Sequence, residues 1–200
     1  MFDITPREFL FILAAVLPSL TIHEFAHAWT AYKFGDDTAK NMGRLTLNPI
    51  AHIDLFGTII LPLILKFGYA KPVPVNFNVL NRGQILLVAI AGPLSNILLA
   101  IILAVAYHVL PLQKESLIID FILLVILINI FLAVFNLIPI PPLDGSRIVY
   151  ASLKSEQAIN MYRNFSRLGI FILIGLIYLG GFRIIVLPIV DFFFNLFNLY

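Results

Sequence analysis

The chain has 200 residues, of which 60% are apolar and 12% are charged, and its mean hydropathy is +0.99. Soluble proteins average roughly 45 to 50% apolar and about 25% charged residues, so this composition excludes a soluble or disordered protein. The net charge of +2 excludes a generic nucleic-acid binder, and the absence of cysteine excludes disulfides and cysteine-ligated metals. We therefore predict a membrane protein in which any metal site is built from histidine and carboxylate side chains.

Several stretches are apolar enough to cross a bilayer, whose hydrocarbon core of roughly 30 Å needs about 20 helical residues. In chain order they are residues 8–32, 85–107, 117–138, 166–180 and, with Pro188 and Asp191 inside it, 182–199. The stretch 55–67 is also apolar, but it is short and contains Gly57 and Pro62. We predict an all-α polytopic membrane protein with about five to six transmembrane helices. A single membrane-embedded domain would cover residues 1–200, with a core at 8–150 and accessory helices at 166–199.

The distribution of Lys and Arg bears on whether residues 55–67 cross the bilayer, because cytoplasmic loops collect basic residues. If the segment crosses, the 13 basic residues divide 8 to 5 between the two faces. If it dips in and returns, they divide 10 to 3, with Arg7, Lys114 and Arg183 in the minority. The sharper asymmetry favours five spans plus a short re-entrant or β-like membrane-dipping segment, with the N-terminus outside and the C-terminus inside.

The first predicted span contains TIHEFAHAW, which places His23, Glu24 and His27 inside an apolar helix where ionisable groups are costly. Positions i and i+4 of a helix lie one above the other, so the two histidines can bind one ion while Glu24 lies beside it. In this HExxH arrangement Zn²⁺ lowers the pKa of a bound water to about 7, and the carboxylate accepts its proton. The alternative is a set of polar residues that only pack helices together.

A catalytic zinc needs a third protein ligand, and the remaining candidates are His52, Asp54, His108, Asp120, Asp144 and Asp191. Asp144 follows the span 117–138 directly in NLIPIPPLDGSR, where three prolines end the helix and Gly145 frees the backbone. Under the re-entrant topology this span and the first span end on the same face, so Asp144 can reach His23 and His27. Under a six-crossing topology they end on opposite faces. An Asp before Gly can also simply form a turn.

The motifs HEFAH, AGPLSN and NLIPIPPLDGSR, in this order, resemble those of the site-2 protease family of intramembrane zinc metalloproteases over roughly residues 8–150. The resemblance implies a minimal member without PDZ or CBS domains. It also implies that His23, His27 and Asp144 bind Zn²⁺ and that Glu24 is the catalytic base.

By the same resemblance, Asn96 in AGPLSN lies near the substrate or the oxyanion. An amide in a span, after helix-disturbing Gly92 and Pro93, would be unsatisfied in lipid, so it should point inward to a partner. An interhelical hydrogen bond is the alternative role, and for Asn129 we expect that structural role. Many family members have a second glycine where this chain has Ser146.

The segment GYAKPVPVNF, residues 68–77, cannot be helical because it contains the alternation Pro72, Val73, Pro74, Val75. A substrate helix must unwind before water can attack its peptide bonds, and an extended segment could bind the freed backbone by strand addition. Members of the family are similar in having a membrane-dipping β element at this point. An ordinary interfacial loop is the alternative.

These observations predict an intramembrane zinc endopeptidase that hydrolyses peptide bonds within or near transmembrane segments of membrane-protein substrates, as in regulated intramembrane proteolysis. Its partners would be transmembrane substrates and the lipid bilayer, not nucleic acid, and its active site would face the cytoplasmic side of a multi-pass protein. The alternative function is a metal-ion or proton transporter that uses His23, Glu24, His27 and Asp144 as a relay, although the chain lacks the repeated halves usual in transporters. A third possibility is a catalytically silent relative that only binds helices, against which the intact HExxH motif argues.

Overall fold

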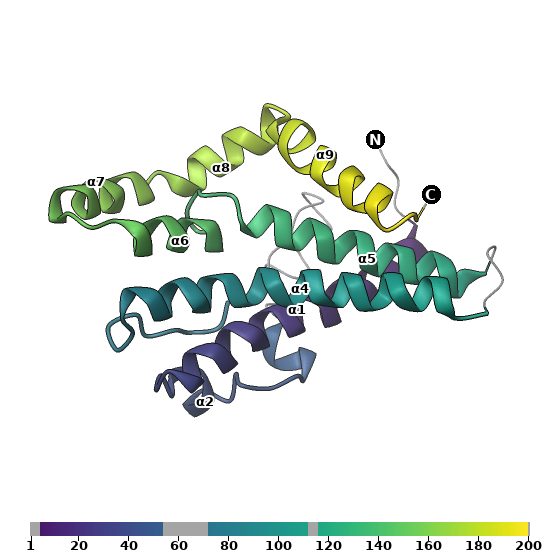
Figure 1. Cartoon of the computed structure of the whole chain (residues 1–200), viewed down its shortest axis with the longest axis horizontal. Helices are drawn as coiled ribbons and strands as arrows, with labels where there is room; N and C mark the ends of the chain where they lie inside the picture. Colours follow the sequence, from purple (N-terminus) through teal and green to yellow (C-terminus); the bar gives the residue numbers. More distant parts are fainter. Residues whose placement is uncertain (1–4, 54–71, 112–115, 200) are drawn as a thin grey trace.

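Helices form all the regular secondary structure in the residues that the computed structural model describes, which are 5–53, 72–111 and 116–199. No β-strand occurs within these ranges, and the predicted all-α fold class is confirmed. The helices are α1 (Pro6–Lys33), α2 (Thr38–Asn41), the 3-10 helix η1 (Pro49–His52), α4 (Arg82–Val109), α5 (Leu117–Asn136), α6 (Asp144–Ser152), α7 (Glu156–Ser166), α8 (Gly169–Tyr178) and α9 (Gly181–Leu196) (Figure 1).

The two longest helices begin at capping boxes, which explains why they start before the predicted apolar stretches. At the start of α1, the Glu8 N–H donates to Thr5 Oγ1 (3.2 Å) and the Thr5 N–H donates to the Glu8 carboxylate (2.8 Å). At the start of α4, Asn81 and Gln84 exchange the same pair of bonds at 3.0 and 2.9 Å. Each cap satisfies main-chain N–H groups that the helix leaves unpaired, at a gain of about 1 kcal/mol.

Three helices are long and apolar enough to cross a membrane, namely α1 and α4 with 28 residues each and α5 with 20. The predicted C-terminal crossings are two shorter helices, α8 with 10 residues and α9 with 16. At about 1.5 Å per residue neither reaches the roughly 30 Å of a bilayer core. The two helices are long enough to cross a bilayer only if they form one span together, and that span is bent by 74°. The described ranges therefore contain three spans, or four with the bent pair, where five to six were expected over the whole chain.

The helices α1 and α5 run parallel to one another. Phe11 and Phe121, near their starts, pack edge to face with ring centroids 5.2 Å apart. Eight residues further along each helix, Asn129 Nδ2 donates to Ser19 Oγ at 2.8 Å. The contacts advance in step along both helices, so α1 and α5 end at the same end of the molecule, where Asp144 follows.

By contrast, α4 runs antiparallel to α1 and begins where α1 ends (Figure 1). Ala31 in the last turn of α1 belongs to one apolar cluster with Ile85 and Val88 in the first turns of α4. The chain thus leaves α1 and enters α4 at one end of the molecule, as the re-entrant topology requires and a single crossing between them does not allow. Residues 55–67 themselves lie outside the described ranges.

Polar side chains lie inside this bundle and large apolar ones outside it. Ser19, Asn96 and Asn129 are 0% exposed, whereas Leu98 and Ile102 on α4 are 52% and 63% exposed. A soluble protein would not leave such a surface uncovered, and a lipid-facing one does. The bundle therefore provides a polar interior in which ionisable groups can find partners.

Candidate metal centre

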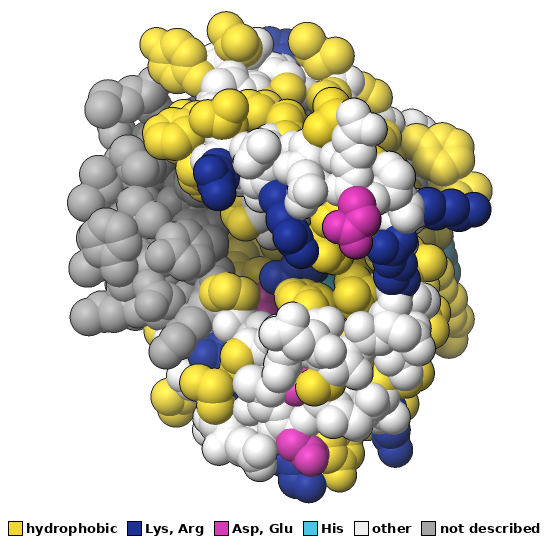
Figure 2. Space-filling model, turned by 90° about the vertical axis from the view of Figure 1, so that its left-hand side faces the viewer, with side chains coloured by type: hydrophobic (Ala, Val, Ile, Leu, Met, Phe, Trp, Pro, Cys, Tyr) yellow, Lys and Arg dark blue, Asp and Glu magenta, His cyan; other side chains and the backbone are white. Residues whose placement is uncertain are grey.

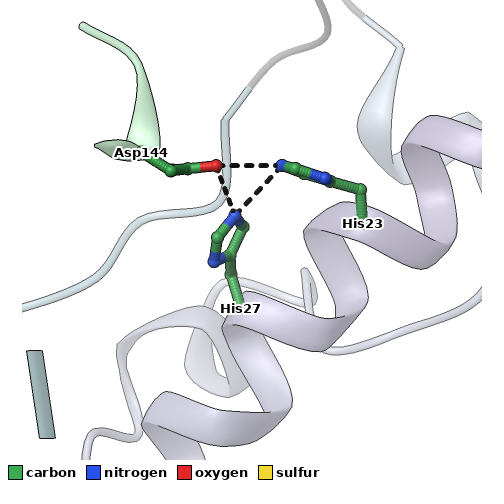
Figure 3. A group of neighbouring side chains, drawn as sticks. All are labelled: His23, His27 and Asp144. Carbon is green, nitrogen blue, oxygen red and sulfur yellow. Dashed lines mark hydrogen bonds and ion pairs between the residues drawn. The ribbon is translucent and has the colours of Figure 1, made fainter. Parts of the chain in front are cut away.

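Three ionisable side chains from α1 and α6 point toward one another (Figure 3). Both of these helices pack against α4. His23 and His27 lie one turn apart on α1, and Asp144 is the first residue of α6. Each is buried. The atoms His23 Nε2, His27 Nε2 and Asp144 Oδ2 form a triangle in which every side is 3.1 Å. The structure thus brings together residues 121 and 117 positions apart in a geometry that can hold a metal ion.

The second nitrogen of each imidazole faces a carbonyl oxygen. His23 Nδ1 lies 2.6 Å from Asn96 Oδ1, and His27 Nδ1 lies 2.7 Å from the Val88 carbonyl oxygen. A carbonyl oxygen can only accept a hydrogen bond, so both Nδ1 atoms carry the proton and both Nε2 atoms present a lone pair. Three electron-pair donors then face one another at 3.1 Å, and a shared cation satisfies all of them.

The dimensions and chemistry of this triangle fit zinc. Tetrahedral zinc with bonds of about 2.0 to 2.2 Å holds neighbouring ligand atoms about 3.3 Å apart. The observed 3.1 Å is close to that spacing. Two imidazoles and one carboxylate also form a donor set that leaves a fourth position open for water or substrate, as catalytic zinc sites require.

Gly92 leaves the space that the two imidazole rings occupy, a role that sequence reasoning missed. A Cβ at this position would collide with His27 Nε2 and would lie 2.7 Å from His23 Nε2. The expectation that Gly92 and Pro93 disturb the helix is corrected, because α4 continues through both. The available signal was a glycine in AGPLSN, the motif that also contains Asn96, which contacts His23.

The prolines before Asp144 end α5, as predicted, but Gly145 acts differently from the expected free turn. Gly145 is helical, in the first turn of α6. A Cβ there would collide with the Leu137 carbonyl oxygen and lie 2.6 Å from that of Ile138. The glycine is therefore needed for close approach of α6 to the end of α5, which directs Asp144 toward α1.

Glu24 lies between the two histidines in sequence and is 8% exposed. Its Oε2 accepts a hydrogen bond from the Val73 N–H at 2.7 Å. The segment that follows is also anchored at its other end, because the Asn76 N–H donates to Asp36 Oδ2 at 2.7 Å. Residues 72–76 therefore run past the predicted catalytic base.

Of the four residues predicted to bind substrate in this segment, Val73 is buried and Pro72 is exposed, while Pro74 and Val75 are half-buried. Residues 72–76 form neither helix nor strand. The described part of the segment is thus irregular, where a β element was expected from the family resemblance.

Asn96 lies behind His23, and its amide bonds only to protein groups. It is 0% exposed, and its Nδ2 donates to Asn129 Oδ1 and to the Ser19 carbonyl oxygen at 2.7 and 3.2 Å. These are the interhelical bonds weighed as the alternative to a substrate contact. They give Asn96 a contact with a candidate metal ligand, while contact with substrate stays a prediction.

The other candidates for a third ligand lie elsewhere. His52 Nε2 faces the Thr46 carbonyl oxygen at 2.9 Å, and His108 Nε2 faces that of Phe197 at 2.7 Å. Asp120 and Asp191 do not belong to the cluster, and Asp54 lies outside the described ranges.

A pocket of about 280 Å³ lies next to this centre. Its lining residues are Phe77, Ile85, Arg147, Tyr150, Tyr162, Arg163 and Ser166. Arg147 joins the pocket to the centre, since its guanidinium lies 4.8 Å from the Phe77 ring centroid and its Nη1 lies 3.7 Å from Asp144 Oδ1. Figure 2 shows basic side chains around a hollow on this end of the molecule.

Tyr162 closes one wall of the pocket by bonding to α6. Its hydroxyl donates to the Ser146 carbonyl oxygen at 2.6 Å. Burial raises the pKa of Tyr162 from its ordinary value, although the hydrogen bond to Ser146 acts in the opposite direction. The hydroxyl therefore remains protonated at neutral pH and fixes α7 to the start of α6.

The sequence profile described as Peptidase family M50 matches this chain over residues 11–115 and 112–179. The chain belongs to peptidase family M50. It is 47% identical over 148 residues to YwhC of Bacillus subtilis, which is 70% of this chain and 67% of YwhC. It is 32% identical over 153 residues to Rip2 of Mycobacterium tuberculosis, or 74% of this chain and 59% of Rip2. Both relatives are named as zinc metalloproteases, and no solved structure matches the chain.

A relative named as a zinc metalloprotease also occurs in Methanocaldococcus jannaschii, where MJ0611 is 30% identical over 145 residues, 70% of each chain. The predicted membership of the site-2 protease family is therefore confirmed, as are the metalloprotease class and zinc as the cofactor. The chain spans about three fifths of Rip2, so the activity of the whole relative does not transfer by similarity alone.

Proposed function

We propose that this protein is an intramembrane zinc endopeptidase that hydrolyses peptide bonds within or near the transmembrane segments of other membrane proteins. The observation that carries the proposal is the triangle of His23, His27 and Asp144, which is buried among helices long enough to cross a membrane. Family membership supports peptide hydrolysis, and the place of the triangle on a spanning helix supports membrane-embedded substrates.

In this proposal, His23, His27 and Asp144 hold the ion and Glu24 acts as the general base. When bound, zinc supplies a Lewis acid that polarises the scissile carbonyl and lowers the pKa of water. Glu24 accepts a proton from the attacking water at its carboxylate and passes it to the leaving amine. The Val73 N–H, bonded to Glu24 Oε2, keeps the carboxylate oriented between these two transfers.

Residues 72–75, which are not helical, would receive the unwound substrate. Pro72 and Pro74 have no N–H and do not continue a helix, whereas Val73 and Val75 carry the groups that pair with a second strand. Because Val73 N–H already bonds to Glu24, pairing would use the Val73 carbonyl and both main-chain groups of Val75. A backbone bound there would lie beside the general base, and we propose these residues as the substrate-binding segment.

The distribution of charge supports a site that faces the cytoplasm. One end of the bundle holds the close of α1 at Lys33, the start of α4 at Arg82, and helices α2 and α6, which carry Lys40 and Arg147 (Figure 1). Basic residues concentrate on the cytoplasmic side of membrane proteins.

We propose one membrane-embedded domain over residues 1–200, whose accessory helices at 166–199 pack beside the core.

The test uses the full chain in proteoliposomes with a model peptide that spans the membrane. Glu24→Gln should lower turnover by about 10² to 10⁴ and leave the zinc content unchanged, because it removes the base and no ligand. Glu156→Gln, the same change on the exposed start of α7, is the matched control. Wild-type turnover in Glu24→Gln would refute the mechanism. Metal flux without cleavage would favour the transporter.

A further inference from the structure

Buried polar side chains from three helices form a continuous hydrogen-bonded chain behind the candidate metal centre. Its members are Ser19 of α1, Asn96 of α4 and Asn129 of α5, each 0% exposed. Polar groups in the middle of spanning helices are costly unless each finds a partner. All three side chains form hydrogen bonds at one point, directly beside His23. This arrangement indicates a role beyond helix packing.

Each bond in this chain has a defined donor. Asn129 Nδ2 donates to Ser19 Oγ at 2.8 Å. Asn96 Nδ2 donates to Asn129 Oδ1 at 2.7 Å and to the Ser19 carbonyl oxygen at 3.2 Å. Asn96 Oδ1 is then the atom that faces His23 Nδ1, at 2.6 Å.

Main-chain carbonyls prevent this direction from reversing. Asn129 Nδ2 also donates to the Val125 carbonyl oxygen at 2.8 Å, and Ser19 Oγ donates to that of Ala15 at 2.8 Å. Rotating the Asn129 amide by half a turn would place its oxygen against the Val125 oxygen. Rotating Asn96 would likewise place its oxygen against Ser19 O. Both amides therefore have one allowed orientation.

The two histidines differ in how their protonation is fixed. His27 Nδ1 faces the Val88 main-chain carbonyl, which can only accept. His23 Nδ1 faces a side-chain amide, which offers its oxygen because its nitrogen donates to Asn129 Oδ1 and to the Ser19 carbonyl oxygen. Were the Asn96 N–H to face His23, the ring proton would move to Nε2 and block the lone pair that a metal needs.

We propose that Asn129 and Ser19 are positioning residues for zinc binding, which act through Asn96 to hold His23 in the tautomer with a free Nε2. The inference rests on the proposed metal centre. A simple interhelical clamp would also use these bonds, but its loss lowers the free energy of unfolding and leaves the zinc affinity of the folded protein unchanged. If Asn129 acts on zinc only through Asn96, its replacement has no further effect on zinc affinity once Asn96 is replaced.

The experiment measures Zn²⁺ affinity by chelator competition on the folded full chain, together with the visible spectrum of the Co²⁺-substituted protein. Asn129→Leu should lower zinc affinity by at most the roughly 10- to 100-fold expected for losing a ligand's direct partner, which is Asn96. Asn129→Asp should retain most of the affinity, because a carboxylic acid kept neutral by burial keeps an acceptor for Asn96 and a donor for the Val125 carbonyl oxygen. The double variant with Asn96→Ala should match Asn96→Ala alone.

The matched control is Asn195→Leu, because Asn195 on α9 makes the same bond to the carbonyl four residues earlier but is exposed. If Asn129→Leu does not fold, Ser19→Ala removes only one hydroxyl and should give a smaller loss that disappears in Asn96→Ala. Wild-type affinity in these variants, equal losses in Asn129→Leu and Asn129→Asp, or additive losses would overturn the inference. A wild-type chain that binds no zinc would instead overturn the metal centre itself.

Discussion

Replacing Gly92 by alanine should weaken metal binding although alanine favours the helix. The added Cβ would lie 2.7 Å from His23 Nε2 and closer still to His27 Nε2. An ordinary contact begins at 3.4 Å, so the His23 ring must move by about 0.7 Å or more. Metal sites tolerate deviations of about 0.2 Å in their ligand distances. We therefore expect zinc affinity to fall by about 10- to 100-fold or more, because loss of a group that orients a metal ligand has an effect of this size.

The assay is zinc content and chelator competition on purified protein, accompanied by thermal unfolding. Alanine in a helix interior is favoured over glycine by about 0.5 to 1 kcal/mol, so a loss of affinity with unchanged or higher stability would point to the imidazoles and not to unfolding. Gly175→Ala in α8 is the control, because a Cβ there meets no atom within 4 Å. Unchanged zinc affinity in Gly92→Ala would show that the rings are not seated on α4, and the geometric reasoning would fail.

Three further changes test other parts of the site. Asp144→Asn removes the anionic ligand, so zinc content after dialysis should fall well below that of the wild type; full retention would exclude Asp144 as a ligand. Val73→Pro removes the N–H that bonds to Glu24. Because hydrogen bonds to charged groups contribute about 1.5 to 3 kcal/mol, turnover should fall about tenfold or more at unchanged zinc content. Turnover equal to that of the wild type would contradict the orienting role of Val73. Tyr162→Phe removes the hydroxyl bonded to Ser146, and the free energy of unfolding should fall by about 0.5 to 1.5 kcal/mol without loss of zinc; a loss of zinc would mean that α7 holds Asp144 in place.

The sequence alone determined the features that depend on local geometry. His23 and His27 share a helix face at any i, i+4 spacing, so their pairing followed from the pattern. Prolines remove main-chain donors wherever they occur, so the end of α5 before Asp144 followed as well. The basic residues also indicated that the chain leaves α1 and returns to α4 on one face, and the ends of these helices lie together.

Tertiary structure decided everything that depends on which helices touch. The favoured topology already allowed Asp144 to reach α1, but the contact itself arises because α5 runs parallel to α1 and because Gly145 lets α6 approach the end of α5. The role of Gly92 arises from the close contact of α4 with two rings on another helix. No periodicity along one segment encodes such contacts, because they are set by packing between residues far apart in the chain. For the same reason the sequence identified Asn96 as a polar residue in need of a partner, while only the packed bundle showed that its partners include His23.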